Sequence, residues 1–208
     1  IQSLGIMIAT MASQRWYFVL CDNEYESRIK WGVNSFDVHI SPIRPFLSNH
    51  FDVILALNED ALEKNIPLFA SNTSWIIANQ KHLWKYFNTQ FSFRIVPLLS
   101  DLKFENIALF CLLLRELGIT ESEAIEEITV FFGERSEFIL RENIWIINAI
   151  FSDQINGRIG RLDSIGKPKK LLHGNESIAL WALNCWLGFF SAYPMTPASS
   201  ILTEIIKA

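Results

Sequence analysis

The 208-residue sequence has a net charge of −4 and a pI near 5.6, with 50% hydrophobic and 19% charged residues. A chain this apolar can bury a large core and does not have the composition of a disordered protein. Its acidic balance offers no basic surface to a nucleic-acid backbone, so nucleic acid is not an expected partner.

Helix and strand patterns alternate through the first part of the chain. A helical spacing of apolar residues over 1–13 is followed by a short strand pattern over 16–21. Apolar and polar residues alternate over 34–41, which predicts a half-buried strand. The continuous apolar run 51–57 predicts a central strand covered on both faces.

The next elements complete a strand–helix–strand order. Asn58 is placed to cap a helix over 59–65, and further strand patterns cover 73–78 and 91–98. The last of these is expected at a sheet edge, because Pro97 cannot donate a hydrogen bond to a neighbouring strand. This order predicts an α/β fold with a three-layer arrangement, in which helices flank a mixed or parallel sheet.

The second half is predicted to be mainly helical. One apolar helix over 104–118 ends at Gly118, and Thr120 caps a second over 121–133. A third helix pattern covers 136–155. This region therefore adds a helical layer to the sheet.

A glycine-rich, basic stretch over 156–170 predicts a linker with solvated charges. A helix pattern from Glu176 and a strand pattern from Gly188 follow it. Residues 177–193 carry no charge, so a transmembrane helix is one alternative. Asn184 and Gly188 interrupt that run, which favours a buried helix followed by a buried strand.

The final turn carries the most distinctive chemistry. Pro194 holds Tyr193 extended, Thr196 is placed to cap the last helix, and Pro197 takes the first helical position. A strand end followed by a helix start presents backbone N–H groups and a hydroxyl at the carboxyl edge of a sheet, where anions bind. This turn predicts a site for a small carboxylate, although a capped helix start without a ligand is the alternative.

Cysteines and histidines are few and scattered. Cys21, Cys111 and Cys185 each lie in an apolar run without a C-x-x-C pair, so we expect free thiols packed in the core. Neither they nor the 4 histidines have zinc or iron–sulfur spacing, and no metal site is predicted on this chain. The sequence starts at Ile1 without a signal-peptide pattern, so we expect a cut N-terminus and a cytoplasmic protein.

A family resemblance rests on the stretch "GNESIALWALNCWLGFFSAYPMTPASSI". It resembles the start of the thiamine-diphosphate-fold, pyrimidine-binding domain in the alpha subunit of 2-oxoacid:ferredoxin (acceptor) oxidoreductases, with the signature G-N-E-A-x-A followed by Y-P-[IM]-T-P-[AS]-[ST]. The resemblance implies that Thr196 is the catalytic residue at the 2-oxoacid site. It also implies that Tyr193, Pro194, Thr196 and Pro197 form the substrate-binding turn.

The first part of the chain resembles the gamma domain that some of these alpha subunits carry at their N-terminus. Residues 22–41 resemble R-E-Y-P-S-x-I-R-G-G-x-N-x-x-x-V-x-I-S, and residues 51–69 resemble D-V-L-V-A-L-x-x-x-A-L-x-x-x-L-x-x-L. Trp31 replaces a glycine and Glu26 a proline of that pattern, which puts a role for this loop in doubt.

Three regions are therefore expected. Residues 1–155 form a gamma-like domain whose glycine-rich opening loop would precede the sequence, residues 156–172 form a linker, and residues 173–208 begin a truncated pyrimidine-binding domain. The acidic residue that contacts the cofactor in the family would lie beyond Ala208. The resemblance thus implies a fragment that is not active alone.

For the whole enzyme, the resemblance implies oxidative decarboxylation of a 2-oxoacid (2-oxoglutarate, pyruvate or a branched-chain acid) to an acyl-CoA, with reduction of ferredoxin or a similar carrier. It places thiamine diphosphate and magnesium with the beta subunit, an iron–sulfur cluster on a partner, and CoA as co-substrate; no residue of this chain is assigned to cofactor binding. No membrane partner is expected. The alternative is a catalytically inactive paralogue that serves as a subunit-interaction module.

Overall fold

The computed structural model describes residues 2–24, 34–44, 48, 50–83, 94–98, 104–132, 137–152, 159–193, 195 and 198–207. The chain forms two compact units, Ile1–Lys169 and Lys170–Ala208, and the division between them falls within the predicted linker. No helix in the described ranges is long and apolar enough to cross a membrane.

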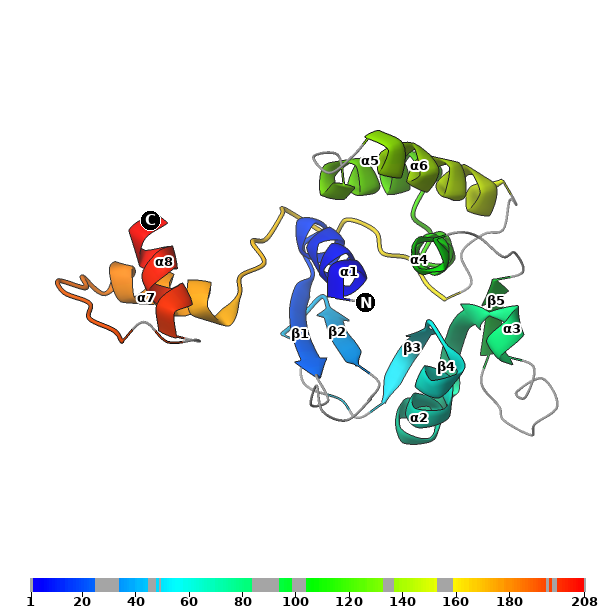
Figure 1. Cartoon of the computed structure of the whole chain (residues 1–208), viewed down its shortest axis with the longest axis horizontal. Helices are drawn as coiled ribbons and strands as arrows, with labels where there is room; N and C mark the ends of the chain where they lie inside the picture. The colour runs from blue at the N-terminus through cyan, green and yellow to red at the C-terminus, as the bar shows by residue number, and fades with distance from the viewer. Residues whose placement is uncertain are drawn as a thin grey trace. The chain divides into compact units, whose positions relative to one another are not determined.

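The first unit opens with helix α1 (Gln2–Gln14), which packs on an antiparallel pair of strands (Figure 1). Strand β1 (Phe18–Glu24) pairs with β2 (Ser35–Ser41) in continuous register. A side chain at Gly5 would overlap the ring of Phe36, so the glycine lets α1 lie close to β2.

The end of α1 is a tight cap formed by the backbone. Trp16 follows the helix in the left-handed region, with φ 78°. Its N–H donates to the Ser13 carbonyl at 3.1 Å, and the N–H of Tyr17 donates to the Ala12 carbonyl at 3.0 Å. These two bonds form a Schellman motif, which usually places glycine where Trp16 stands.

A parallel three-stranded sheet follows, in the order β3–β4–β5. Strand β3 spans Phe51–Ala56, β4 spans Ala70–Asn79 and β5 spans Arg94–Leu98. The predicted edge position of the Pro97 strand is confirmed, because β5 pairs only with β4 among the described strands. The prediction of a central strand over 51–57 is wrong for this sheet: β4 occupies the centre, and most of β3 is only half-buried. A continuous apolar run reports the apolar surroundings of a strand but not its order in the sheet.

Helices cover both faces of this sheet. Ile76 and Ala78 of β4 pack towards α2 (Glu59–Phe69), whereas Ile77 between them belongs to the core around α4 (Glu105–Glu116). Alternate residues of a strand point to opposite faces, so α2 and α4 lie on opposite sides of the sheet. The short helix α3 (Gln80–Leu83) follows β4. The predicted three-layer α/β arrangement is confirmed.

Two further helices form an outer layer over α4, as Figure 1 shows. They are α5 (Glu121–Phe132) and α6 (Glu137–Phe151). Helix α4 is apolar on almost every side, as expected of a helix enclosed between layers. Gly118, which follows the C-cap residue Leu117, has a φ of 70°, the left-handed conformation predicted for a glycine that terminates this helix. The predicted end of α5 at Gly133 lies outside the described residues.

The second unit consists of α7 (Gly174–Asn184) and α8 (Ala198–Lys207). The strand predicted from Gly188 is wrong, because the described residues 187–193 have no regular secondary structure. A strand needs a neighbouring strand to receive its backbone hydrogen bonds. The described residues of this unit provide none.

Candidate functional site

The two halves of the resemblance signature meet in the second unit. Near the start of α7, the side-chain amide of Asn175 donates a hydrogen bond to the Ser200 hydroxyl in the first turn of α8. Beside it, Glu176 accepts a hydrogen bond from Lys170, with 2.7 Å between Nζ and Oε1. This bond lowers the pKa of Glu176, aided by the charge of Lys170 and a hydrogen bond from the His173 backbone. The start of α7 is therefore fixed both to α8 and to the segment before it.

The turn before α8 was predicted to bind a carboxylate. The N–H of Met195 donates to the Tyr193 carbonyl at 2.7 Å, and the N–H of Ser199 donates to the Met195 carbonyl at 3.2 Å. Helical hydrogen bonding thus begins with the carbonyl of Met195. The first turn of α8 contains no acidic residue, so the positive end of its helix dipole is not neutralised by a side chain of that turn.

Three of the four predicted site residues, Pro194, Thr196 and Pro197, lie outside the described residues. The fourth, Tyr193, is 78% exposed. The roles of all four stay predictions.

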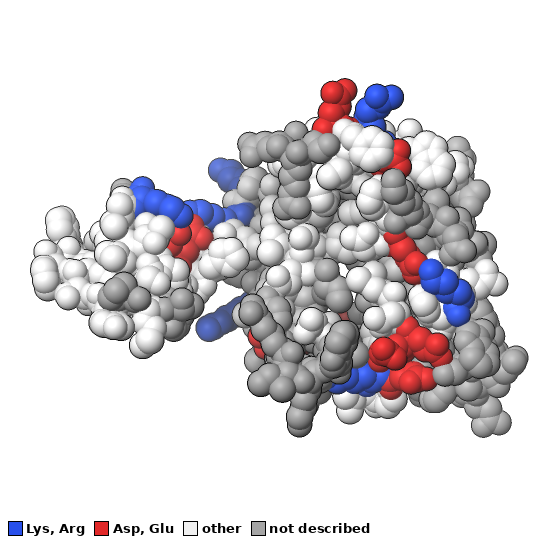
Figure 2. Space-filling model, viewed as in Figure 1, with Lys and Arg blue, Asp and Glu red and all other residues white. Residues whose placement is uncertain are grey.

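Large apolar side chains around this turn are exposed. The exposed fraction is 93% for Trp186, 83% for Phe189 and 70% for Trp181, and in α7 only Ala179 is buried. The prediction of a buried helix followed by a buried strand is therefore wrong for the unit by itself. Figure 2 shows the face of this unit at the left of the view, where most residues are uncharged. A large uncharged aromatic surface is typical of a protein interface or of a face that other protein covers.

The cysteines have three different environments. Cys111 on α4 is buried, and burial raises the pKa of its thiol to about 12. Cys21 is half-buried, and desolvation raises its thiol pKa as well. Cys185, in contrast, is exposed at the end of α7, so the prediction of a core cysteine is wrong at this position. The apolar run around Cys185 belongs to the exposed aromatic surface.

A cleft of about 790 Å³ lies in the first unit, between β2 and β3. Apolar side chains from α1, β2, β3 and α4 line it, together with polar residues that include His39, His50 and Arg161. All of its lining residues belong to the first unit, whereas the predicted site residues belong to the second. Sequence reasoning missed this cleft, because the alternation over 34–41 shows that β2 has an apolar face but not what that face borders. Trp31 and Glu26, the two departures from the gamma-domain pattern, lie outside the described residues.

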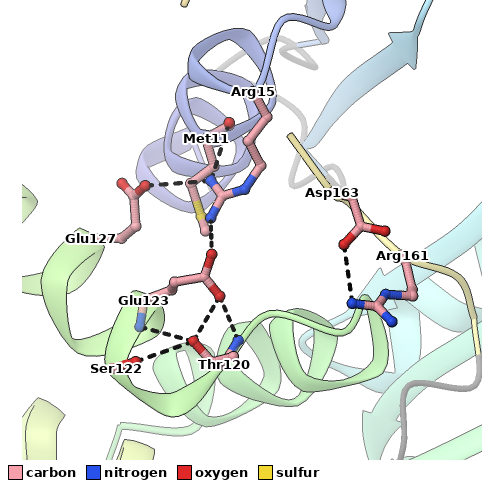
Figure 3. Close-up of polar contacts among 8 residues, drawn as sticks. All are labelled: Met11, Arg15, Thr120, Ser122, Glu123, Glu127, Arg161 and Asp163. Atoms are coloured by element: carbon pink, nitrogen blue, oxygen red, sulfur yellow. Dashed lines mark hydrogen bonds and ion pairs between the residues drawn. The ribbon is translucent and has the colours of Figure 1, made fainter. Parts of the chain in front are cut away.

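An ionic cluster joins α1 to α5 (Figure 3). Arg15 contacts Glu123 at 3.0 Å and Glu127 at 3.6 Å, and it also donates to the Met11 carbonyl. Thr120 caps α5 as predicted: its hydroxyl accepts from the Glu123 N–H at 3.4 Å, while its own N–H donates to the Glu123 carboxylate at 2.8 Å. This reciprocal pair is a capping box, in which each partner satisfies a donor of the other.

The pKa values of the two carboxylates of this cluster are shifted in opposite directions. Hydrogen bonds from the Thr120 side chain and backbone lower the pKa of Glu123, and the bond and charge of Arg15 lower it further. Burial raises the pKa of Glu127, which the charge of Arg15 offsets only in part. Because Arg15, Thr120, Glu123 and Glu127 each contact another residue of the chain, the arrangement is one that holds helices together (Figure 3). Its sequence signal was the T-x-x-E pattern, which does not show that Arg15 joins it.

Metal-ligating side chains do not gather in the part of the chain that the structure describes, where no three His, Cys, Asp or Glu residues are close enough to hold an ion.

Comparison with known proteins gives structural relatives only. No family model matches the chain, and no curated protein matches it in sequence. Among solved structures, 2-oxoglutarate:ferredoxin oxidoreductase from Magnetococcus marinus, with 2-oxoglutarate, coenzyme A and succinyl-CoA bound, matches 99% of this chain with a TM-score of 0.72 and 20% identity. This chain covers 38% of the length of that one.

Two shorter relatives match as well. The keto/oxoacid ferredoxin oxidoreductase gamma subunit from Geobacter sulfurreducens matches 72% of this chain with a TM-score of 0.55 and 14% identity. Pyruvate oxidoreductase subunit PORC from Thermotoga maritima matches 73% with a TM-score of 0.55 and 18% identity, and 88% of each shorter chain is covered. This chain has the fold of these oxidoreductase subunits. The fold expected from the sequence resemblance is confirmed.

Proposed function

We propose that this chain is part of a cytoplasmic 2-oxoacid:ferredoxin (acceptor) oxidoreductase. Its first unit would be the gamma domain and its second unit the start of the pyrimidine-binding domain. One observation carries the proposal: a single oxidoreductase chain matches 99% of this chain, whereas the two shorter subunits match only 72% and 73%. The two shorter subunits leave more than a quarter of this chain unmatched, whereas the longer oxidoreductase chain matches nearly all of it.

The reaction proposed for the whole enzyme is oxidative decarboxylation of a 2-oxoacid to an acyl-CoA, with transfer of electrons to ferredoxin or a similar carrier. Thiamine diphosphate, held with magnesium by the beta subunit, would supply the chemistry at the keto carbon. The proposal gives the iron–sulfur cluster to a partner and gives this chain the substrate side of the site.

The residue proposed to act on the substrate is Thr196. A hydroxyl at the start of a helix can donate a hydrogen bond to a carboxylate, and the helix dipole adds partial positive charge. Two observations support this placement: the first turn of α8 carries no acid, and Asn175 fixes that turn by its bond to Ser200. Tyr193, Pro194 and Pro197 would set the shape of the turn.

The test is to produce the full-length protein that contains these residues together with its beta subunit. The purified complex is supplied with 2-oxoglutarate, pyruvate or a branched-chain 2-oxoacid, and reduction of a viologen dye is followed. We expect reduction that depends on both CoA and one of these acids. A stable complex that reduces no dye with any of them would contradict the catalytic assignment and support the interaction module instead. Failure of the two proteins to associate would contradict both.

A further inference from the structure

The second half of the predicted linker is bonded to the first unit along its length. The N–H of Leu162 donates to the Leu117 carbonyl at 3.0 Å, just beyond α4. Further on, the N–H of Ile165 donates to the Arg15 carbonyl at 3.0 Å and that of Lys169 to the Ser13 carbonyl at 2.9 Å. These N–H groups donate to carbonyls at the ends of two helices, where few partners are available within the helix; the Ser13 carbonyl accepts from Lys169 in addition to Trp16. The described residues 159–169 therefore belong to the first unit rather than to free chain.

Lys169 is the last residue held in this way. Its ammonium lies 3.2 Å from the ring centroid of Phe18 and 5.2 Å from that of Trp16. Gly166 lies against the ring of Trp16 so closely that any side chain there would overlap it. The ammonium has no hydrogen-bond partner among the described residues, and desolvation lowers its pKa. Its attraction to the two rings is a cation–π interaction, which is strongest when water is excluded.

The next residue, Lys170, is held in the second unit. Its ammonium lies 2.7 Å from the Glu176 carboxylate, in the first turn of α7. Its side chain is 69% exposed, so this ion pair is weaker and more sensitive to salt than the contact of Lys169. The compact units also divide between these two residues.

We propose that Lys169 and Lys170 form a two-sided anchor that confines the hinge between the units to the single peptide joining them. Lys169 fixes the chain to the first unit through Trp16 and Phe18, and Lys170 fixes it to the second through Glu176. A linker of many residues gives the units it joins a wide range of separations, whereas a single peptide leaves only rotations about its own bonds. Removing one anchor lengthens the free segment on that side alone.

Hydrogen exchange resolved to single amides tests this in the full-length protein. The amides of Ile165 and residue 169 report the first anchor. The amide of Ser177, which donates to the His173 carbonyl at 2.9 Å, reports the second. Lys169→Met should speed exchange of the amides of residues 165 and 169 about tenfold and leave the exchange rate of the Ser177 amide unchanged. Lys170→Met should speed exchange at Ser177 about twofold and leave the first pair unchanged.

Three controls make the test specific. Lys167→Met removes an exposed lysine from the same segment and should change neither reporter. Lys169→Arg keeps a positive charge over the rings, because Arg makes cation–π contacts as Lys does, and should exchange like the parent protein. High salt should speed exchange at Ser177 only.

The inference is overturned if Lys169→Met matches Lys167→Met, or if either anchor variant speeds both reporters together. The amide of Ala124, which donates to the Thr120 carbonyl at 3.0 Å in α5, monitors the fold and should be unaffected throughout.

Discussion

Two tryptophans occupy the same local structure in the two units, and their surroundings differ. Trp16 follows α1 with φ 78°, and Trp186 follows α7 with φ 61°. Trp186 repeats the Schellman pattern: its N–H donates to the Leu183 carbonyl, and the next N–H donates to the Ala182 carbonyl. Trp16 is 36% exposed and packs against the 165–169 segment, whereas Trp186 is 93% exposed.

The difference shows what the second unit lacks. A left-handed conformation costs a non-glycine residue about 1–2 kcal/mol, so a bulky side chain there needs an offsetting contact. Trp16 has that contact from Gly166 and Lys169 within its own unit. Trp186 has almost none from the described residues of its unit. A strained, exposed aromatic residue is a mark of a surface that functions by meeting other protein.

Thiol reactivity should give the largest contrast between the units. A pKa of about 12 leaves Cys111 with roughly a thousandfold less thiolate at pH 8 than an ordinary thiol has. Cys185 is exposed, so iodoacetamide should label it first, Cys21 more slowly and Cys111 only on unfolding. Peptide mapping after timed labelling gives the order. Protection of Cys185 in the whole enzyme, but not in the isolated chain, would show that its surface is covered there.

The second-largest contrast should be in turnover, which should respond to a mutation in the second unit and not to a matched one in the first. Under the proposed function, Thr196→Val in the full enzyme removes the proposed hydroxyl donor and should lower kcat about a hundredfold, because losing one such donor typically raises the barrier by a few kcal/mol. Thr120→Val in the first unit is the matched control: it breaks the α5 cap, lowers stability by about 1 kcal/mol and leaves kcat unchanged. Near-native turnover of Thr196→Val would remove this residue from the site.

Glycine at each tryptophan position sharpens the comparison itself. Trp16→Gly relieves the left-handed strain but loses the packing against Gly166 and Lys169, so the free energy of unfolding should fall by about 2 kcal/mol. Trp186→Gly relieves the same strain with little packing to lose, so stability should stay equal or rise by up to about 1 kcal/mol. Urea unfolding measures both. A large loss with Trp186→Gly would mean that its ring is packed within the isolated chain.

The smallest effect is expected at the α1–α5 cluster. The lowered pKa of Glu123 contributes stability that is present above the pKa of the unfolded chain and is lost as pH falls through the folded value. Because the side chain is 43% exposed, Glu123→Gln should remove about 0.5 kcal/mol at pH 7 and almost nothing at pH 3. The pKa of Glu127 is raised, so its contribution to stability changes with pH in the opposite direction. Glu126→Gln removes a carboxylate from the same helix and is the matched control for Glu123→Gln.

Local signals in the sequence predicted the first unit well. The cap at Asn58 is confirmed, since its side chain accepts from the Ala61 N–H at 2.8 Å. Three further predictions are confirmed: Thr120 caps α5, Gly118 has the left-handed conformation after α4, and the strand with Pro97 lies at the sheet edge. Such signals depend only on residues that are neighbours in the sequence, so the sequence alone is enough to predict them.

The wrong predictions concern apolar segments whose burial depends on parts of the protein that are distant in sequence. The central position predicted for the 51–57 strand, the strand from Gly188 and the core location of Cys185 all required knowing which surface covers an apolar run. An apolar pattern shows that a segment is to be covered but does not name what covers it. The cleft between β2 and β3 has the same origin, because it depends on how two sheets approach each other.

The charge-free stretch of the second unit also affects how the protein can be made. From residue 177 to residue 203 the chain carries no acidic or basic residue. Charged residues that flank apolar segments act as gatekeepers against aggregation, and this stretch has none within it. Synthesised without its partners, the chain should therefore depend on chaperones to stay dispersed. Co-expression with the proposed beta subunit should raise its yield more than lowering the temperature does.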